Sequence, residues 1–412
     1  MSAKQRRGTG SIAVLAVAGL VLAGAAATFA LGIGVLAAVM ARRIVTPPTR
    51  RKDDTRVHGV DLSAGTITLQ STPDSVLPGD YSFWFSVETG HARLGEIMHS
   101  TPAAVTRRIL GVDFGDLESA TCGRLGGYAY LGPADLGYEF EDVLIPTDAG
   151  QAPAWFFPAA EEESNPRWVI QVHGRAVQRQ ETLRAVPVFR EAGYSSLLVS
   201  YRNDGEAPAS GDQRYGLGDT EWQDVEAAIG FARSRGATSI VLMGWSMGGA
   251  IALQTATRTG HGDVIAGVVL DSPVIDWADV VSFQGSTLRL PAPVMSGAMR
   301  VMGRRWVRRL TGQAQPIDFE RLDFVARARD LAVPILLLHS DDDGYVPSAP
   351  SRALAVLRPD IVTFVPFTVA RHTKLWNYDR DGWNLAIRSW LAGLDSSARR
   401  SHPRHPAGAG ED

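Results

Sequence analysis

One serine in the sequence stands in a pattern that favours nucleophilic chemistry, Gly244-Trp245-Ser246-Met247-Gly248. The apolar run before it, residues 239–243, is typical of a strand, and residues 250–258 after it are typical of a helix. A sharp strand-to-helix turn exposes a serine hydroxyl but strains its backbone, and glycines two positions away on either side avoid a clash. The helix that follows also points its N-terminus at developing negative charge. The motif therefore predicts Ser246 as a nucleophile.

A serine hydroxyl reacts only when a base takes its proton, and histidine is the usual base. The histidines downstream of the serine are His261, His339, His372, His402 and His405. Around such a turn the chain order is nucleophile, acid, base. His372 follows the last strand-like run, residues 361–365, and is the predicted base. His261 lies in a loop expected at the opposite sheet edge, and His339 comes before any suitable acid. His402 and His405 lie in the C-terminal tail.

The acid is expected after the strand-like run at residues 334–338. There the chain reads His339-Ser340-Asp341-Asp342-Asp343. One carboxylate would orient the histidine ring and stabilise its charged form. Three adjacent carboxylates cannot all face one ring, and their spacing does not choose among them. Asp271, which follows the preceding strand-like run, is a less favoured alternative.

An oxyanion formed during such a reaction needs preorganised N–H donors. The N–H of Met247, directly after the nucleophile, is the first candidate. The second is expected after the strand-like run at residues 168–172, where His173-Gly174-Arg175 follows. Because Gly174 lets the backbone approach closely, the Arg175 N–H is the predicted second donor.

These residues depend on the elements that position them. Between residues 138 and 395, near-continuous apolar runs alternate with helical stretches, which predicts a mostly parallel sheet with helices on both faces. Ligands of such folds bind beyond the carboxyl ends of the strands, where the candidate residues stand. We expect Tyr201-Arg202-Asn203-Asp204, after the run at 195–200, to line the entrance.

Residues 276–330 interrupt this alternation and are predicted to form a helical cap. The interruption holds a basic run made of Arg300, Arg304, Arg305, Arg308 and Arg309. Such a run could meet an acidic substrate or lipid head groups, although a solvated helix face is the more ordinary interpretation.

The composition narrows the class of protein. The chain has 412 residues, with 41 Lys and Arg against 44 Asp and Glu, and a net charge of −3 that gives no case for nucleic acid. Its one cysteine, Cys122, lies outside the candidate site and excludes an internal disulfide, a cysteine-rich zinc site and a thiol nucleophile. The predicted chemistry needs no metal and no cofactor. Nothing in the sequence gives an oligomeric state.

Residues 11–41 form a run of 31 residues without a charged side chain, after an N-terminal flank at 1–10. As a helix this run would be about 46 Å long, more than the ~30 Å core of a bilayer. We predict a retained single-pass transmembrane helix or signal-anchor, with a signal peptide cleaved near Ala25-Ala26-Ala27 as the alternative. Basic residues flank both ends, so the side of the membrane that holds the catalytic domain stays open.

The remaining segments are assigned from composition. Residues 42–56 are predicted to be a linker, and 57–137 a small β-rich domain in which we recognise no catalytic pattern. His91 and His99 in that domain have no recognisable ligand partner and are interpreted as surface or structural residues. The tail at 396–412 is expected to be disordered.

From about Tyr138 to Leu394 the chain resembles the α/β-hydrolase superfamily, and within it the prolyl-oligopeptidase-like and acylaminoacyl-peptidase-like serine hydrolases. The acid motif of these relatives, His-Gly-x-x-Asp-x-x-Val-Pro, aligns with His339 through Pro347, except that Ser340 replaces the glycine. This resemblance implies Asp343 as the acid and Arg175 in the donor position. Residues 57–137 are too few for the N-terminal propeller of many relatives.

The leading hypothesis is a membrane-anchored serine hydrolase that cleaves a small-molecule or peptide ester or amide through an acyl-enzyme. Ser246 would attack, His372 would transfer protons, and Asp343 would orient His372. One alternative is a non-catalytic binding or scaffold protein that keeps the fold. Another is an activity on lipid or envelope acyl groups close to the membrane.

Overall fold

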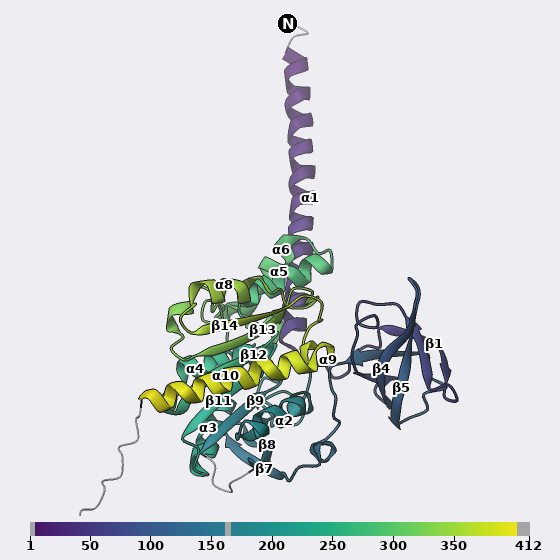
Figure 1. Ribbon diagram of the computed structural model, residues 1–412. Coiled ribbons are helices and arrows are strands. Elements are labelled where there is room, and N and C mark those ends of the chain that lie inside the picture. Colours follow the sequence, from purple (N-terminus) through teal and green to yellow (C-terminus); the bar gives the residue numbers. More distant parts are fainter. Residues whose placement is uncertain (1–4, 161–165, 402–412) are drawn as a thin grey trace, which may run out of the picture. The chain divides into compact units, whose positions relative to one another are not determined.

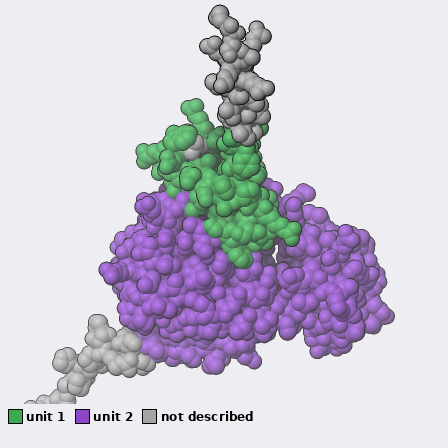
Figure 2. All heavy atoms as spheres, turned by 90° about the horizontal axis from the view of Figure 1, so that it is seen from above, with its two compact units in different colours: residues 1–46, 281–317 green, residues 47–280, 318–412 purple. Residues whose placement is uncertain are grey.

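The computed structural model of the chain describes residues 5–160 and 166–401 (Figure 1). These residues divide into two compact units. One combines residues 5–46 with residues 281–317, and the other contains the described residues of 47–280 together with 318–401 (Figure 2). The larger unit holds the central sheet and all the candidate catalytic residues.

An eight-stranded sheet forms the centre of the larger unit, within the described residues. Its strand order is β14-β13-β12-β11-β9-β10-β8-β7. Strands β7 and β8 pair antiparallel, as do β8 and β10, and the other neighbours are parallel. The strands are β7 (Glu141–Thr147), β8 (Gly150–Phe157), β9 (Arg167–Val172), β10 (Ser195–Val199), β11 (Ser239–Trp245), β12 (Ile265–Asp271), β13 (Ile335–Ser340) and β14 (Val362–Phe367). The mostly parallel sheet that the apolar runs predict is confirmed.

Helices connect these strands. They are α2 (Val186–Glu191), α3 (Trp222–Ser234), α4 (Met247–Arg258), α8 (Ala349–Leu357), α9 (Leu375–Tyr378) and α10 (Arg380–Ser401), with 3-10 turns at η2 (Arg179–Ala185), η3 (Gly262–Val264) and η5 (Ala328–Asp330). Helix α2 begins after the 3-10 turn η2, and Pro187 stands in its first turn, where the fixed φ of proline suits a helix start. Helix α10 continues to Ser401, so residues 396–401 are helical rather than disordered, and residues 402–412 lie outside the described residues.

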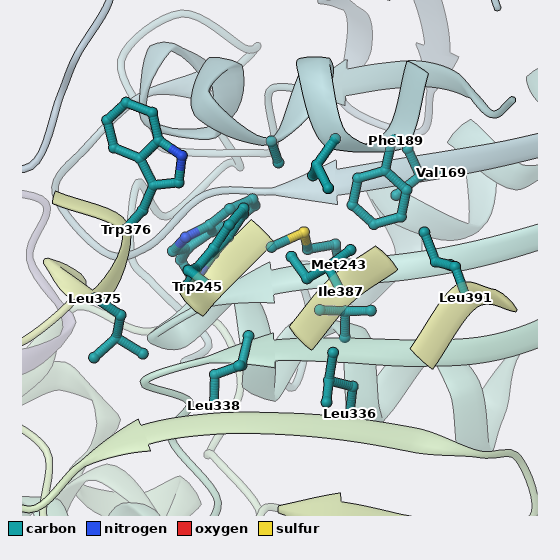
Figure 3. Close-up of a cluster of buried hydrophobic side chains, with 14 of the residues drawn as sticks. Val169, Phe189, Met243, Trp245, Leu336, Leu338, Leu375, Trp376, Ile387 and Leu391 are labelled. Atoms are coloured by element: carbon teal, nitrogen blue, oxygen red, sulfur yellow. The ribbon is translucent and has the colours of Figure 1, made fainter. Parts of the chain in front are cut away.

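A buried cluster of apolar side chains packs between the sheet and the helices on one of its faces (Figure 3). It joins residues of β9, β11 and β13 to α2 and α10, and includes Val169, Phe189, Met243, Trp245, Leu336, Leu338, Leu375, Trp376, Ile387 and Leu391. Trp245 directly precedes the candidate nucleophile, and Leu375 comes three positions after the candidate base. The same core therefore holds both ends of the candidate site.

Residues 55–126 form a closed antiparallel barrel with strand order β1-β2-β5-β4-β3-β6. Its strands are β1 (Thr55–Asp61), β2 (Thr66–Gln70), β3 (Tyr81–Phe85), β4 (Gly90–Ser100), β5 (Ala104–Phe114) and β6 (Cys122–Gly126). The barrel has its own apolar core, which includes Ile67, Phe83 and Leu94. His91 is buried and bonds Asp113 through Nδ1 at 2.8 Å, in keeping with a structural role. After the barrel, a connection with the turn η1 (Pro133–Leu136) leads to β7.

The smaller unit contains the long N-terminal helix α1 (Gln5–Val45) and the middle of the insertion between β12 and β13. The insertion is helical, as predicted, with α5 (Trp277–Thr287), α6 (Ala292–Met302), η4 (Arg305–Val307) and α7 (Arg308–Thr311). Helices α6 and α7 both contact α1. Residues 26–45 of α1 are long and apolar enough to cross a membrane, a property that a signal sequence or a buried helix can share.

Candidate active site

The turn between β11 and α4 holds Ser246 in a strained conformation, with φ of 53° and ψ of −117°. A positive φ is uncommon for a residue other than glycine and often marks a functional position. A Cβ atom on Gly244 would lie 2.2 Å from the Gly248 carbonyl oxygen. A Cβ atom on Gly248 would lie 2.1 Å from the Val172 carbonyl oxygen. Both glycines are therefore required by close backbone approach on the two sides of the serine.

The loop between β14 and α9 brings His372 to this turn. Its Nε2 lies 2.9 Å from Ser246 Oγ, and its Nδ1 lies 2.7 Å from Asp343 Oδ2. The three side chains come from three separate strand ends, in the chain order that the sequence predicts. Both ring nitrogens of His372 are thus engaged, one with a hydroxyl and the other with a carboxylate, which is the arrangement a general base requires.

The three consecutive aspartates point to different partners. Asp341 is paired with Arg352 at 2.6 Å, and Asp342 with Arg371 at 3.3 Å. Of the three, Asp343 is the one at hydrogen-bond distance from the candidate base. Its other oxygen, Oδ1, accepts the backbone N–H groups of the next turn, at residues 345 and 346, each at 2.8 Å. These bonds fix the orientation of the carboxylate.

The electrostatics of Asp343 favour its ionised form. Burial alone would raise the pKa of this carboxyl group, but the charges and hydrogen bonds of His372 and His339 outweigh burial and hold the pKa below its usual value. His339 Nε2 lies 3.3 Å from Asp343 Oδ2, and His339 Nδ1 lies 2.7 Å from Ser351 Oγ. His339 therefore supports the acid rather than approaching the serine.

The alternative acid, Asp271, faces elsewhere. It is fully buried, and its two oxygens accept the indole N–H of Trp383 and the hydroxyl of Ser272, each at 2.9 Å. Burial raises the pKa of this carboxyl group. Ser272 Oγ in turn accepts the N–H of Thr373 at 3.2 Å. Asp271 thus supports the loop after His372 through its neighbour.

The loop after β9 places Gly174 against the nucleophile, as the sequence suggests. A Cβ atom on Gly174 would lie 3.3 Å from Ser246 Cβ. The Gly174 N–H donates to Glu181 Oε2, and its carbonyl accepts from the Tyr201 hydroxyl, both at 2.8 Å. These bonds fix the peptide groups that lead to Arg175. No sequence signal marks Glu181, which stands in the turn η2, for this role.

The four residues expected at the entrance, 201–204, lie instead behind this loop. Tyr201 is fully buried and stacks on His173, whose Nε2 is 3.1 Å from Asp204 Oδ2. Arg202 forms an ion pair with Asp224 at 2.7 Å. The expectation was wrong because partners on other elements bury these polar side chains, and a sequence pattern does not show such partners.

A pocket of about 360 Å³ opens at the candidate nucleophile. Several charged side chains line this pocket. They are Arg51, Arg175, Arg371, Lys374, Asp74 and Glu181. The barrel, in which the sequence showed no catalytic pattern, contributes to this wall. Its β2–β3 connection carries Asp74, whose Oδ1 lies 2.7 Å from Lys374 Nζ, two residues after the candidate base.

The described residues lack the set of ligand side chains that a metal ion requires. Residues 5–160 and 166–401 contain no group of three or more His, Cys, Asp or Glu side chains that could hold a metal ion.

The sheet, the nucleophile turn and the serine–histidine–aspartate contacts together define a protein of the α/β-hydrolase class. The chain belongs to the alpha/beta hydrolase family, whose sequence model matches residues 172–383, more than half of the chain. The predicted class of enzyme, a hydrolase, is confirmed. The finer resemblance to prolyl-oligopeptidase-like enzymes is not confirmed and stays a prediction. Residues 56–126 match a domain of unknown function, DUF8805.

Several solved esterases are similar to this chain in fold. An esterase of Pyrococcus furiosus, Pf2001, is 18% identical with a TM-score of 0.49, over 64% of this chain and 94% of that one. Est1E from Butyrivibrio proteoclasticus, with bound ferulic acid, is 16% identical with a TM-score of 0.48, over 62% and 99%. A thermophilic esterase from Thermogutta terrifontis is 19% identical with a TM-score of 0.44, over 62% and 99%. No curated protein matches the chain significantly.

Proposed function

We propose that the protein is a membrane-anchored serine hydrolase that cleaves an ester or amide through an acyl-enzyme intermediate. The observation that supports this most directly is the pair of contacts made by His372, 2.9 Å to Ser246 Oγ and 2.7 Å to Asp343 Oδ2. The strained backbone of Ser246, at the end of β11, adds to it because such strain is common at functional positions.

In the proposed mechanism, Ser246 Oγ attacks the substrate carbonyl carbon while its proton passes to His372 Nε2. Asp343 holds Nδ1 of the ring and stabilises the imidazolium that forms. The N–H groups of Met247 and Arg175 stabilise the oxyanion, with the N-terminus of α4 adding its partial positive charge. Collapse expels the alcohol or amine, which takes the proton from His372. Water, deprotonated by the same imidazole, then releases the acid and regenerates the serine.

Ser246→Ala tests the nucleophile. We expect ester turnover by the purified protein, measured with a p-nitrophenyl ester, to fall to near the uncatalysed rate, and labelling by a fluorophosphonate probe to disappear. Ser119→Ala, at an exposed serine after β5, is the matched control and keeps both signals. Undiminished turnover in Ser246→Ala contradicts the proposed mechanism. An unlabelled, inactive but folded wild-type protein would favour a non-catalytic binding role instead.

Anchoring by α1 is the second part of the proposal. The helix runs from Gln5 to Val45, and several of its apolar side chains are exposed, among them Phe29, Leu31 and Val35. Exposed apolar side chains on a long helix are favourable in lipid and costly in water. We expect the protein to stay in the membrane fraction after alkaline carbonate washing. Its intact mass should include residues 1–41, since a mass lacking about 25 residues would indicate a cleaved signal peptide.

A further inference from the structure

The insertion contributes an unusual charge distribution to the smaller unit. Residues 281–317 contain six arginines and no lysine, aspartate or glutamate, whereas the whole chain has a net charge of −3. Five of these arginines fall within residues 300–310, here called the basic segment. All five are exposed: Arg300, Arg304, Arg305, Arg308 and Arg309. The basic segment is thus a local concentration of positive charge on a chain that is slightly acidic overall.

Other side chains do not neutralise this charge. Within the described residues, none of the five arginines has an acidic side chain at ion-pair distance; Arg308 Nη1 donates to the Ala314 carbonyl oxygen at 2.7 Å. The segment also exposes two large apolar side chains, Trp306 at 77% and Leu310 at 50%. Arginine beside exposed tryptophan and leucine is the composition found at membrane interfaces, where an aromatic ring lies at the level of the head groups.

The contacts of α1 place this segment at one end of the candidate span. A Cβ atom on Gly297 of α6 would lie 2.9 Å from Ala37 Cβ, so α6 packs closely on α1 at that position. Ala37 and Ala41 are buried, while Phe29, Leu31 and Val35 are exposed. A helix needs about 20 residues to cross the ~30 Å hydrocarbon core. The apolar run at 11–41 exceeds this by about 11 residues, and its last residues are the ones packed near α6.

The smaller unit therefore takes up part of the excess length of the apolar run. The part of α1 before Ala37 is long enough to span the lipid, and Ala37, Met40 and Ala41 after it are buried in protein, whereas Val39 is exposed. Helix α7, which begins at Arg308 within the basic segment, also contacts α1. We propose that the basic segment binds the head groups of anionic phospholipids beside α1, an inference that rests on the proposed anchoring. Positive charge close to an anionic leaflet is favourable, and it adds a second signal to that of the helix.

A fluorescence experiment on the full chain tests this proposal. Leu310→Cys in a Cys122→Ser background places one environment-sensitive fluorophore on the basic segment, and the chain is reconstituted in phosphatidylcholine nanodiscs. A small fraction of nitroxide-labelled phosphatidylglycerol, or of nitroxide-labelled phosphatidylcholine, then serves as the quencher. We expect at least about threefold stronger quenching by the anionic lipid, since each basic residue at a surface attracts such lipids, and a difference that shrinks at high salt.

The test variant replaces Arg304, Arg305, Arg308 and Arg309 by glutamine, and we expect it to be quenched equally by the two lipids. The charge-matched control replaces four exposed arginines of the larger unit by glutamine, namely Arg108, Arg233, Arg329 and Arg388, and keeps the preference. Equal quenching in the unsubstituted basic segment, or a preference that survives in the test variant, overturns the proposal.

Co-elution of the chain with nanodiscs on a sizing column distinguishes head-group binding by the basic segment from anchoring by α1. A chain that co-elutes with neutral discs but shows no anionic preference keeps the anchor and loses the head-group site. A chain that co-elutes with discs containing phosphatidylglycerol, and not with neutral discs, keeps the head-group site and loses the anchor. Failure to co-elute with either overturns both. None of these measurements depends on catalysis, so an inactive protein does not affect them.

Discussion

Replacing Asp343 by asparagine removes a charge while keeping the shape of the side chain, and the surrounding bonds determine how the amide must lie. Oδ1 of Asp343 accepts the N–H groups of Tyr345 and Val346, each at 2.8 Å. An amide NH2 at that position would face two donors, so the amide oxygen must occupy it. The NH2 group then occupies the position of Oδ2, 2.7 Å from His372 Nδ1.

This orientation selects the wrong tautomer of His372. Nδ1 must now accept a hydrogen bond from the amide, so the ring proton moves to Nε2, which faces Ser246 Oγ at 2.9 Å. A protonated Nε2 cannot take the serine proton. Loss of the correct tautomer in a serine–histidine–aspartate triad reduces kcat by about 10⁴-fold. At ~1.36 kcal/mol per tenfold change, the barrier to acylation rises by about 5.5 kcal/mol.

The assay is turnover of a p-nitrophenyl ester, together with the rate of fluorophosphonate labelling, on protein whose folding is checked by thermal unfolding. Two aspartates serve as controls. Asp342→Asn changes an exposed neighbour that pairs with Arg371, and Asp271→Asn changes a buried carboxyl that bonds Trp383. Asp342→Asn should stay within a fewfold of the unsubstituted protein, and Asp271→Asn, which acts on the loop after His372 only through Ser272, should lose far less activity than Asp343→Asn. A folded Asp343→Asn protein within tenfold of normal activity, or an equal loss in Asp271→Asn, would falsify the assignment of the acid.

Three further outcomes are expected. Gly244→Ala should fold poorly or lose several kcal/mol of stability, because its Cβ would meet the Gly248 carbonyl oxygen at 2.2 Å, and thermal unfolding measures this. Asp74→Asn should lower the melting temperature and reduce ester turnover severalfold, because Lys374, which is 9% exposed, loses its partner at 2.7 Å. The lowered pKa of Asp343 should make the free energy of unfolding fall as pH drops below about 4, where the unfolded state takes up a proton that the folded state does not.

Control variants distinguish each of these three effects from the general effect of a substitution. Gly262→Ala adds a methyl group where nothing lies within 4 Å, so it should leave stability nearly unchanged. Asp80→Asn removes an exposed carboxylate 3.8 Å from Arg380, and such surface pairs contribute about 0–1 kcal/mol. Asp343→Asn should have a flatter dependence of unfolding free energy on acidic pH. A slope identical to that of the unsubstituted protein would show that this carboxyl group does not account for the acid sensitivity.

Much of the candidate site could be predicted from the sequence because its signals are local. The nucleophile turn needs glycine at 244 and 248, and backbone atoms within a few residues or on the adjacent strand impose that need. The order serine, aspartate, histidine is the chain order expected around such a nucleophile turn. The apolar runs predict the parallel strands β9, β10, β11, β13 and β14 to within two residues, because a strand buried on both faces consists almost entirely of apolar residues.

Local sequence does not show which of Asp341, Asp342 and Asp343 contacts His372. The three residues are chemically identical and adjacent, and the family resemblance, rather than their spacing, implied Asp343. In the structure they are distinguished by Arg352, Arg371 and His372, which come from later elements. A sequence pattern cannot reveal such partners because the chain folds them together from more than ten residues away.

Sequence alone therefore determined the class of fold, the strand–turn–helix around Ser246 and the presence of a long apolar helix, since composition and periodicity encode each of them. The tertiary structure alone decided which carboxylate meets His372, that Asp74 of the barrel lines the pocket, and that α6 packs on the end of α1. The physical reason is common to all three. Hydrogen bonds, ion pairs and close packing act over a few ångströms in space, and the chain brings their partners together from distant positions.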